Sequence, residues 1–209
     1  MQRLIAHWCR GAAVMVVAGL AAAPMAHAQE GPEALVKRVS QDVIATIKSD
    51  PLVQAGNQAR IREVMESKLA PNFDFPRMTA LAMGRNWRSA TPEQQQRLTD
   101  EFRTLLVRTY SSALTKYRDE VIEYKPLRAN PGDTDVTVRT AVLKPGGAPI
   151  QIDYSMGNTA AGWKAYDVIV GGVSLVTNYR DEFNEQIKSG GVDGLIKTLA
   201  DKNKGAAAK

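Results

Sequence analysis

The chain has 209 residues, a formal net charge of +5 and a single cysteine. Its length suits one domain that buries a full hydrophobic core without disulfides or metals to stabilise it. The weakly basic balance includes no stripe of clustered lysine and arginine, so composition gives no indication of a nucleic-acid partner.

The first 28 residues have the pattern of a secretory signal peptide. Arg3 and Arg10 precede an apolar run, GAAVMVVAGLAAA, and the small residues AHA end at Ala28. The apolar run is too short for a comfortable membrane span. We therefore expect export to the periplasm and cleavage after Ala28, which lowers the net charge to +3.

The chain after Ala28 contains no histidine and no cysteine, because His7, Cys9 and His27 all lie in the expected signal peptide. This excludes disulfides, thiol catalysis and a serine–histidine dyad. It also removes the usual zinc, copper and haem ligands. We expect no cofactor and no metal site, and any chemistry would use carboxylate, lysine, tyrosine or serine side chains.

Three amphipathic segments open the mature chain. Apolar residues at helical spacing predict helices over 33–48, 58–69 and about 76–84. Pro51 and Pro71 separate these helices, because proline lacks the backbone N–H that a helix interior requires.

A longer helix follows. Thr91-Pro92-Glu93 is a typical start, with a capping hydroxyl, a proline at the first position and an acid in the first turn. Apolar side chains then recur every three or four residues from Phe102 to about Val121. This helix is the expected spine of the fold.

The second half of the chain changes to a period of two, which is typical of strands with one buried face. The alternating segments are 134–143, 149–156 and 163–170, with 121–127 as a further candidate strand. Residues 145–147 and 158–162 have the composition of hairpin turns. Two final helices are expected, about 174–188 and 192–202, separated by Gly190-Gly191.

The pair Gly171-Gly172 raises the alternative of a phosphate-binding loop. A dinucleotide loop requires G-x-G-x-x-G inside a βαβ unit, and a P-loop requires Gly-Lys-Ser or Gly-Lys-Thr; neither pattern is present. We interpret the two glycines as a sharp corner at a strand end, with Ser174 capping the helix that follows.

Helices first, a sheet later and helices last predict an α+β fold. The helices are expected to pack on one face of a curved antiparallel sheet of about four strands, because nothing else can cover its apolar face. Residues 29–203 would form this single domain, and residues 204–209 a flexible tail.

Several segments together resemble the MlaC, or toluene-tolerance, family. They are 74–90 (DFPRMTALAMGRNWRSA), 102–110 (FRTLLVRTY), 149–154, 163–180 (WKAYDVIVGGVSLVTNYR) and 183–199 (FNEQIKSGGVDGLIKTL). The resemblance extends in order over nearly all of the mature chain. It implies a periplasmic carrier, not an enzyme, that holds a phospholipid by its acyl chains in a deep apolar cavity between sheet and helices.

The resemblance also implies partners. Such carriers shuttle phospholipid, as monomers, between an outer-membrane lipoprotein–porin complex and an inner-membrane ABC transporter complex with its MCE-type component. Their role is to maintain the lipid asymmetry of the outer membrane.

The candidate lipid-contacting residues are apolar or aromatic side chains on the helical stripes or on the strand face turned toward the helices. They are Leu81, Trp87, Phe102, Leu106, Tyr110, Ile150, Ile152, Tyr154, Val168, Val170 and Val173. For each of them ordinary core is the alternative, because core residues have the same periodicity. Arg85 and Arg88 are candidates for a cationic rim or for a solvated face, and Tyr179-Arg180 for a partner contact.

Two other classes of function stay open. A small cavity enzyme would use a strand carboxylate, Asp153 or Asp167, with a pKa raised by burial. Both carboxylates, however, alternate with the inward residues and are expected to point away from them. A cargo-free periplasmic adaptor or chaperone would have a closed core and would co-purify without lipid.

Overall fold

The computed structural model describes residues 30–114, 120–143 and 146–205, so the expected signal peptide lies outside the described residues. The helical elements are α1 (Pro32–Ser49), α2 (Pro51–Gln54), α3 (Gln58–Val64), η1 (Met65–Leu69), η2 (Ala70–Asn72), α4 (Phe75–Met83), η3 (Gly84–Ser89), α5 (Pro92–Leu114), η4 (Thr177–Tyr179) and α6 (Arg180–Gly205). The strands are β1 (Val121–Tyr124), β2 (Asp135–Leu143), β3 (Ile150–Thr159), β4 (Gly162–Val170) and β5 (Val173–Ser174). This order confirms the predicted α+β class.

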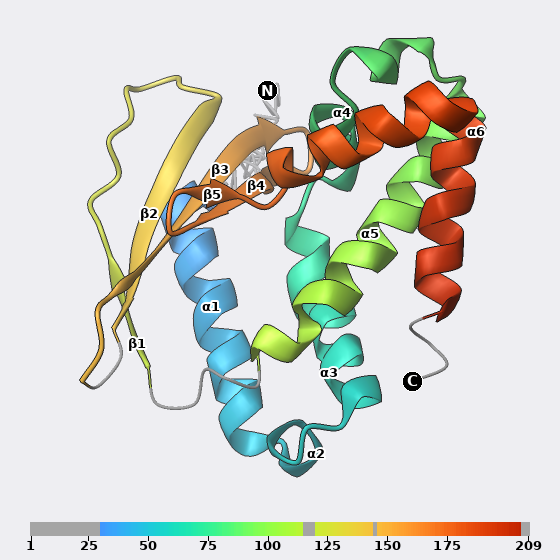
Figure 1. Cartoon of the computed structure of the whole chain (residues 1–209). Helices are drawn as coiled ribbons and strands as arrows, with labels where there is room; N and C mark the ends of the chain where they lie inside the picture. Colours follow the sequence, from blue (N-terminus) through green and yellow to red (C-terminus); the bar gives the residue numbers. More distant parts are fainter. Residues whose placement is uncertain (1–29, 115–119, 144–145, 206–209) are drawn as a thin grey trace, which may run out of the picture.

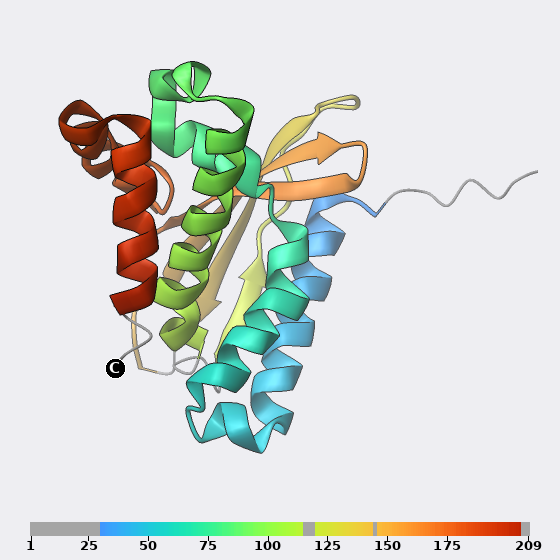
Figure 2. The same ribbon diagram turned by 90° about the vertical axis from the view of Figure 1, so that its right-hand side faces the viewer.

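The strands form one antiparallel sheet in the order β1-β2-β3-β4-β5, so each strand pairs with its neighbour in sequence. The register places Val138 opposite Tyr154, and Tyr154 opposite Val168, which gives these three residues the same face of the sheet. Figures 1 and 2 show the helices gathered on one side of the sheet, with α1, α3, α5 and α6 following one another across it.

Two predicted helix boundaries are wrong. The helix expected to reach about Val121 stops earlier, because Val121 begins β1. The helix expected from residue 174 begins at Arg180, because β5 and the short turn η4 come first, and β5 also raises the strand number to five. Lys204 and Gly205, expected in the flexible tail, belong to α6, and the rest of that segment, residues 206–209, lies outside the described residues.

Other sequence signals are confirmed in place. Asp50 ends α1, and its carboxylate accepts hydrogen bonds from the backbone of Leu52 and Val53 to start α2. The break expected at Gly190-Gly191 is a kink in α6, where Gly191 has a φ of 67°. Such a left-handed conformation favours glycine because it lacks a Cβ.

The segment after α3 departs from regular helix. Pro71 has no N–H to donate to the carbonyl of Ser67, and its ring would collide with that carbonyl in an α-helix. The chain forms the wider π-helical turn η1 instead, which is closed by a hydrogen bond from the N–H of Ala70 to the carbonyl of Met65. The side chain of Asn72 then donates to the carbonyl of Lys68 at 2.7 Å. The irregular stretch η1–η2 thus keeps its hydrogen bonds while changing the direction of the chain.

Within the described ranges, the buried apolar residues fall into three clusters. The first joins α4, α5 and α6 around Phe102 and Phe183, and the second joins the start of α1 to β2, β3 and β4. The third, which includes Ile47 and Ile61, lies between α1, α2 and α3. Globular domains of this size usually have one continuous core. Internal cavities are therefore expected at the boundaries between these clusters.

Candidate functional site

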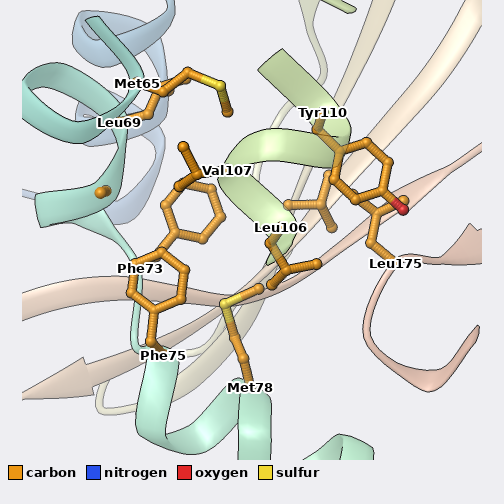
Figure 3. Close-up of a pocket in the computed structure, with 11 residues that line it drawn as sticks. Met65, Leu69, Phe73, Phe75, Met78, Leu106, Val107, Tyr110 and Leu175 are labelled. Carbon is orange, nitrogen blue, oxygen red and sulfur yellow. The ribbon is translucent and has the colours of Figure 1, made fainter. Parts of the chain in front are cut away.

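The principal apolar pocket lies where α4, α5 and η1 approach strand β4. It has a volume of about 100 Å³. Its walls are Met65, Leu69, Ala70, Phe73, Phe75, Met78, Leu106, Val107, Tyr110, Val168 and Leu175. Figure 3 shows the labelled side chains converging from η1, α4, α5 and the segment after β4. The hydroxyl of Tyr110 is the one polar side-chain group on this wall, so the pocket suits an apolar ligand.

Helix starts and helical spacing position these side chains. The carboxylate of Asp74 accepts from the backbone N–H of Arg77 at 3.0 Å and so starts α4, which carries Phe75 and Met78 into the pocket. On α5, Leu106 and Tyr110 are four residues apart and therefore lie on one face of the helix.

A second apolar pocket of about 50 Å³ lies between α1 and the sheet. Leu35, Val36, Val39 and Ser40 of α1 form one wall, and Tyr154, Met156 and Ala165 of the strands form the other. Leu69, Asn72 and Phe73 complete it. Leu69 and Phe73 therefore line both apolar pockets.

Hydrogen bonds to the carboxylate of Asp167 hold the tight turn at the end of β4 in place. Gly171 and Gly172 have φ angles of 59° and 86°, which confirms the tight turn predicted there. The carboxylate of Asp167 accepts from the backbone N–H groups of Val168 at 2.8 Å and Val176 at 3.2 Å, and from the hydroxyl of Ser174 at 2.5 Å. These bonds hold the segment after β5 against the strand that lines the principal pocket.

Asp167 alternates with Val168, as expected, but it is only 8% exposed. The segment after β5 covers it, because Ser174 and Val176 donate to its carboxylate. A register shift lies just before it in β4: Ser155 pairs with Asp167, but Met156 pairs with Ala165. The extra residue breaks the simple alternation of β4. With three donors on its carboxylate, Asp167 has a structural role. Asp153 lies on β3 with Arg139 at 3.9 Å.

The structure brings four of the predicted site residues to the pockets. Leu106, Tyr110 and Val168 line the principal pocket, and Tyr154 lines the second one. Burial raises the pKa of Tyr110 to about 12, with a further contribution from the nearby Tyr179. The phenol is therefore neutral at physiological pH, as an apolar pocket requires.

The other predicted residues lie elsewhere. Phe102 is fully buried in the first cluster, where its ring centroid is 5.1 Å from those of Tyr179 and Phe183, and Leu81 and Trp87 pack against the same cluster. Ile150, Ile152 and Val170 are half-buried and line neither pocket, while Val173 is 57% exposed on β5.

The polar candidates lie away from the apolar walls. Arg85 and Arg88 are exposed, and Arg85 lines a separate polar groove with Asn184 and Lys188. The guanidinium of Arg180 donates to the carbonyl of Leu81 at 3.0 Å, which ties the start of α6 to α4.

The residues that sequence reasoning missed are those of the irregular segment and its neighbours, chiefly Met65, Leu69, Phe73 and Met78. Apolar side chains on both sides of Pro71 were the available signal. Helical periodicity alone cannot distinguish a pocket wall from a solid core.

In the described part of the chain, no helix combines the length and the apolar character needed to cross a membrane.

Comparisons with known proteins agree on one family. The family model described as "MlaC protein" matches residues 37–201. The toluene tolerance protein ttg2D of Pseudomonas putida is 29% identical over 173 residues, which cover 82% of this chain and 80% of that protein. The intermembrane phospholipid transport system binding protein MlaC of Haemophilus influenzae is 22% identical over 172 residues, 81% of this chain and 80% of its own length.

A solved structure supports the same grouping. The phospholipid-binding protein from Ralstonia solanacearum, solved in complex with a phospholipid, is 42% identical to this chain. The two structures align with a TM-score of 0.78, over 86% of this chain and 99% of the other.

Proposed function

Because the chain belongs to the MlaC family, we propose that it is a periplasmic phospholipid carrier that holds the acyl chains of its cargo between the helices and the sheet. The observation that carries this proposal is the principal pocket, which is lined by apolar side chains from η1, α4, α5 and β4. The related Ralstonia protein, with a phospholipid bound, supports it.

Physical chemistry explains why such a carrier is needed. The two tails of a phospholipid contain on the order of 30 methylenes, each of which costs about 0.8 kcal/mol to expose to water. A lipid that crosses an aqueous compartment must therefore keep both tails covered. An apolar site with solvation similar to that of a membrane makes transfer nearly balanced, so docking partners can determine its direction. We propose the outer-membrane lipoprotein–porin complex and the inner-membrane ABC transporter complex as these partners.

The apolar pockets are small beside the proposed cargo. A dry cavity of about 150 Å³ accommodates one benzene molecule. The principal pocket has about 100 Å³ and the second about 50 Å³. Neither holds a complete acyl chain, so loading requires the helical layer to move away from the sheet.

Native mass spectrometry of the purified mature protein, with lipid identification after extraction, tests the proposal. We expect one adduct with the mass of a phospholipid. A protein that carries no lipid and also refuses added phospholipid vesicles would instead favour the cargo-free adaptor.

A matched pair of variants locates the site. Met78→Gln keeps the length of the side chain but places an amide in the principal pocket, where it finds no partner and costs free energy. Leu52→Gln makes a similarly apolar-to-amide change at a position that is 53% exposed on α2. We expect Met78→Gln to weaken phospholipid binding about tenfold, with Leu52→Gln unchanged. Equal binding by both variants would place the cargo elsewhere.

A further inference from the structure

A ridge formed by Leu69 and Phe73 divides the apolar interior of the protein. Leu69 packs against the second and third clusters, and Phe73 packs against the first and second. The same two side chains separate the pocket beside α5 from the pocket beneath α1, because they line both. In Figure 3, Leu69 and Phe73 lie on the side of the principal pocket opposite Tyr110 and Leu175.

The backbone under the ridge is hydrogen-bonded to the sheet at its Phe73 end. Phe73 forms a parallel bridge with Ala165 of β4, and the N–H of Asp74 donates to the carbonyl of Ala165 at 2.8 Å. Leu69, by contrast, ends the π-helical turn η1, where Pro71 prevents a regular helix. The ridge is therefore bonded to the sheet at Phe73 and continues into irregular backbone at Leu69. This combination suits a pocket wall whose side chains change position when a ligand binds.

Packing on the ridge is loose for an interior position. Leu69 and Phe73 are only half-buried, whereas neighbours on both flanks, such as Val39 and Met78, are buried. Interior side chains normally interdigitate without gaps. The pockets on both flanks of the ridge show that core side chains do not pack tightly around it.

We propose that the two acyl chains of one phospholipid lie on opposite flanks of this ridge, one beside α5 and the other beneath α1. Phe73 is then the partition between two single-chain compartments, and it selects for a lipid with two tails. This inference rests on the proposed carrier function and adds to it the arrangement of the cargo. Each of the two pockets marks the place where one chain enters.

Photocrosslinking of the wild-type protein tests this arrangement directly. The probe is a diacyl phospholipid that carries a diazirine on both chains, loaded onto delipidated protein at one lipid per protein. We expect crosslinked peptides from α1, which lines the second pocket, and from the Leu106–Tyr110 stretch of α5, which lines the principal one. Crosslinks confined to the α5 side would overturn the two-flank arrangement and leave the carrier function intact.

Stoichiometry with a single-tailed lysophospholipid gives a second test. Two separate compartments predict that the wild-type protein binds two lysophospholipid molecules but only one diacyl lipid, as counted by native mass spectrometry. A maximum of one lysophospholipid would contradict the partition. Failure to bind either lipid would overturn the carrier function as well, so the two failures are distinguishable.

A matched pair on α1 tests the pocket beneath it. Val39→Phe fills the second pocket, while Val43→Phe makes the same change one helical turn away, in the third cluster and outside both pockets. Val39 is 8% exposed and Val43 is 5% exposed, so both variants overpack a buried site. We expect Val39→Phe to reduce lysophospholipid stoichiometry to one and to weaken diacyl binding about tenfold, with Val43→Phe near wild type. Equal effects of the two variants would show that lipid does not enter beneath α1.

Discussion

Replacing Asp167 by alanine tests whether this carboxylate fastens the corner between β4 and α6. The substitution removes an acceptor that serves the N–H groups of Val168 and Val176 and the hydroxyl of Ser174. Val176 is fully buried, so water cannot easily replace the lost partner. A hydrogen bond to a charged group contributes about 1.5–3 kcal/mol, and a buried donor left without a partner costs about 1–3 kcal/mol.

These contributions are not additive, so we expect Asp167→Ala to lower the free energy of unfolding by about 3–5 kcal/mol. Asp167→Asn is the control, because its amide oxygen can still accept from both N–H groups; we expect a loss of about 1–2 kcal/mol. Urea denaturation of the lipid-free variants measures both values, with the denaturant slope unchanged if the folded structure is retained. A loss below about 1 kcal/mol for Asp167→Ala would refute the assigned role.

Three further predictions concern backbone and charge. Gly191→Ala should lower the free energy of unfolding by about 1 kcal/mol, because its positive φ is strained for alanine. No atom outside the adjacent backbone would lie within 4 Å of the new Cβ, so the loss comes from this backbone strain. Thermal denaturation measures it, and an unchanged melting temperature would contradict it. Gly157→Ala would place its Cβ 2.5 Å from the Nη1 atom of Arg77. It should therefore displace the guanidinium from its position 3.5 Å above the ring of Tyr166, which a crystal structure of the variant would show. Because the pKa of Tyr110 is raised in the folded protein, the unfolded state loses the phenol proton first, and the free energy of unfolding should fall as pH rises from 10 to about 12. Urea titrations of Tyr110→Phe should show a smaller fall over that range. An identical fall would exclude Tyr110 as its source.

The regular elements were predictable because burial on one face leaves a direct trace in the sequence. Helix α1 follows its apolar stripe, and the alternation of β2 places Val138 fully inside. The adjacent glycines Gly171 and Gly172 predict their turn from composition alone. In these places local preference and tertiary packing require the same residues.

The predictions failed where tertiary structure overrides the local pattern. Asp167 is buried because the segment after β5 folds back onto its carboxylate, a contact that the alternation of β4 cannot reveal. Val121 continues the apolar period of α5 but begins β1, since the strand pairing with β2 is a long-range contact. The ridge at Leu69 and Phe73 depends on a π-helical turn, which has no distinctive period in the sequence.

The division of the interior into three clusters also bears on the order in which the chain folds. The third cluster consists of residues between 43 and 64, so the helices α1, α2 and α3 can associate before the strands have formed. Strands that pair only with their sequence neighbours then assemble through local contacts, which favours rapid folding. The start of α1 packs instead on β2, β3 and β4. Native-state hydrogen exchange should therefore show two cooperative units, one formed by α2, α3 and the end of α1, the other by the sheet and the start of α1. The boundary between the two units would then lie in the middle of the single helix α1.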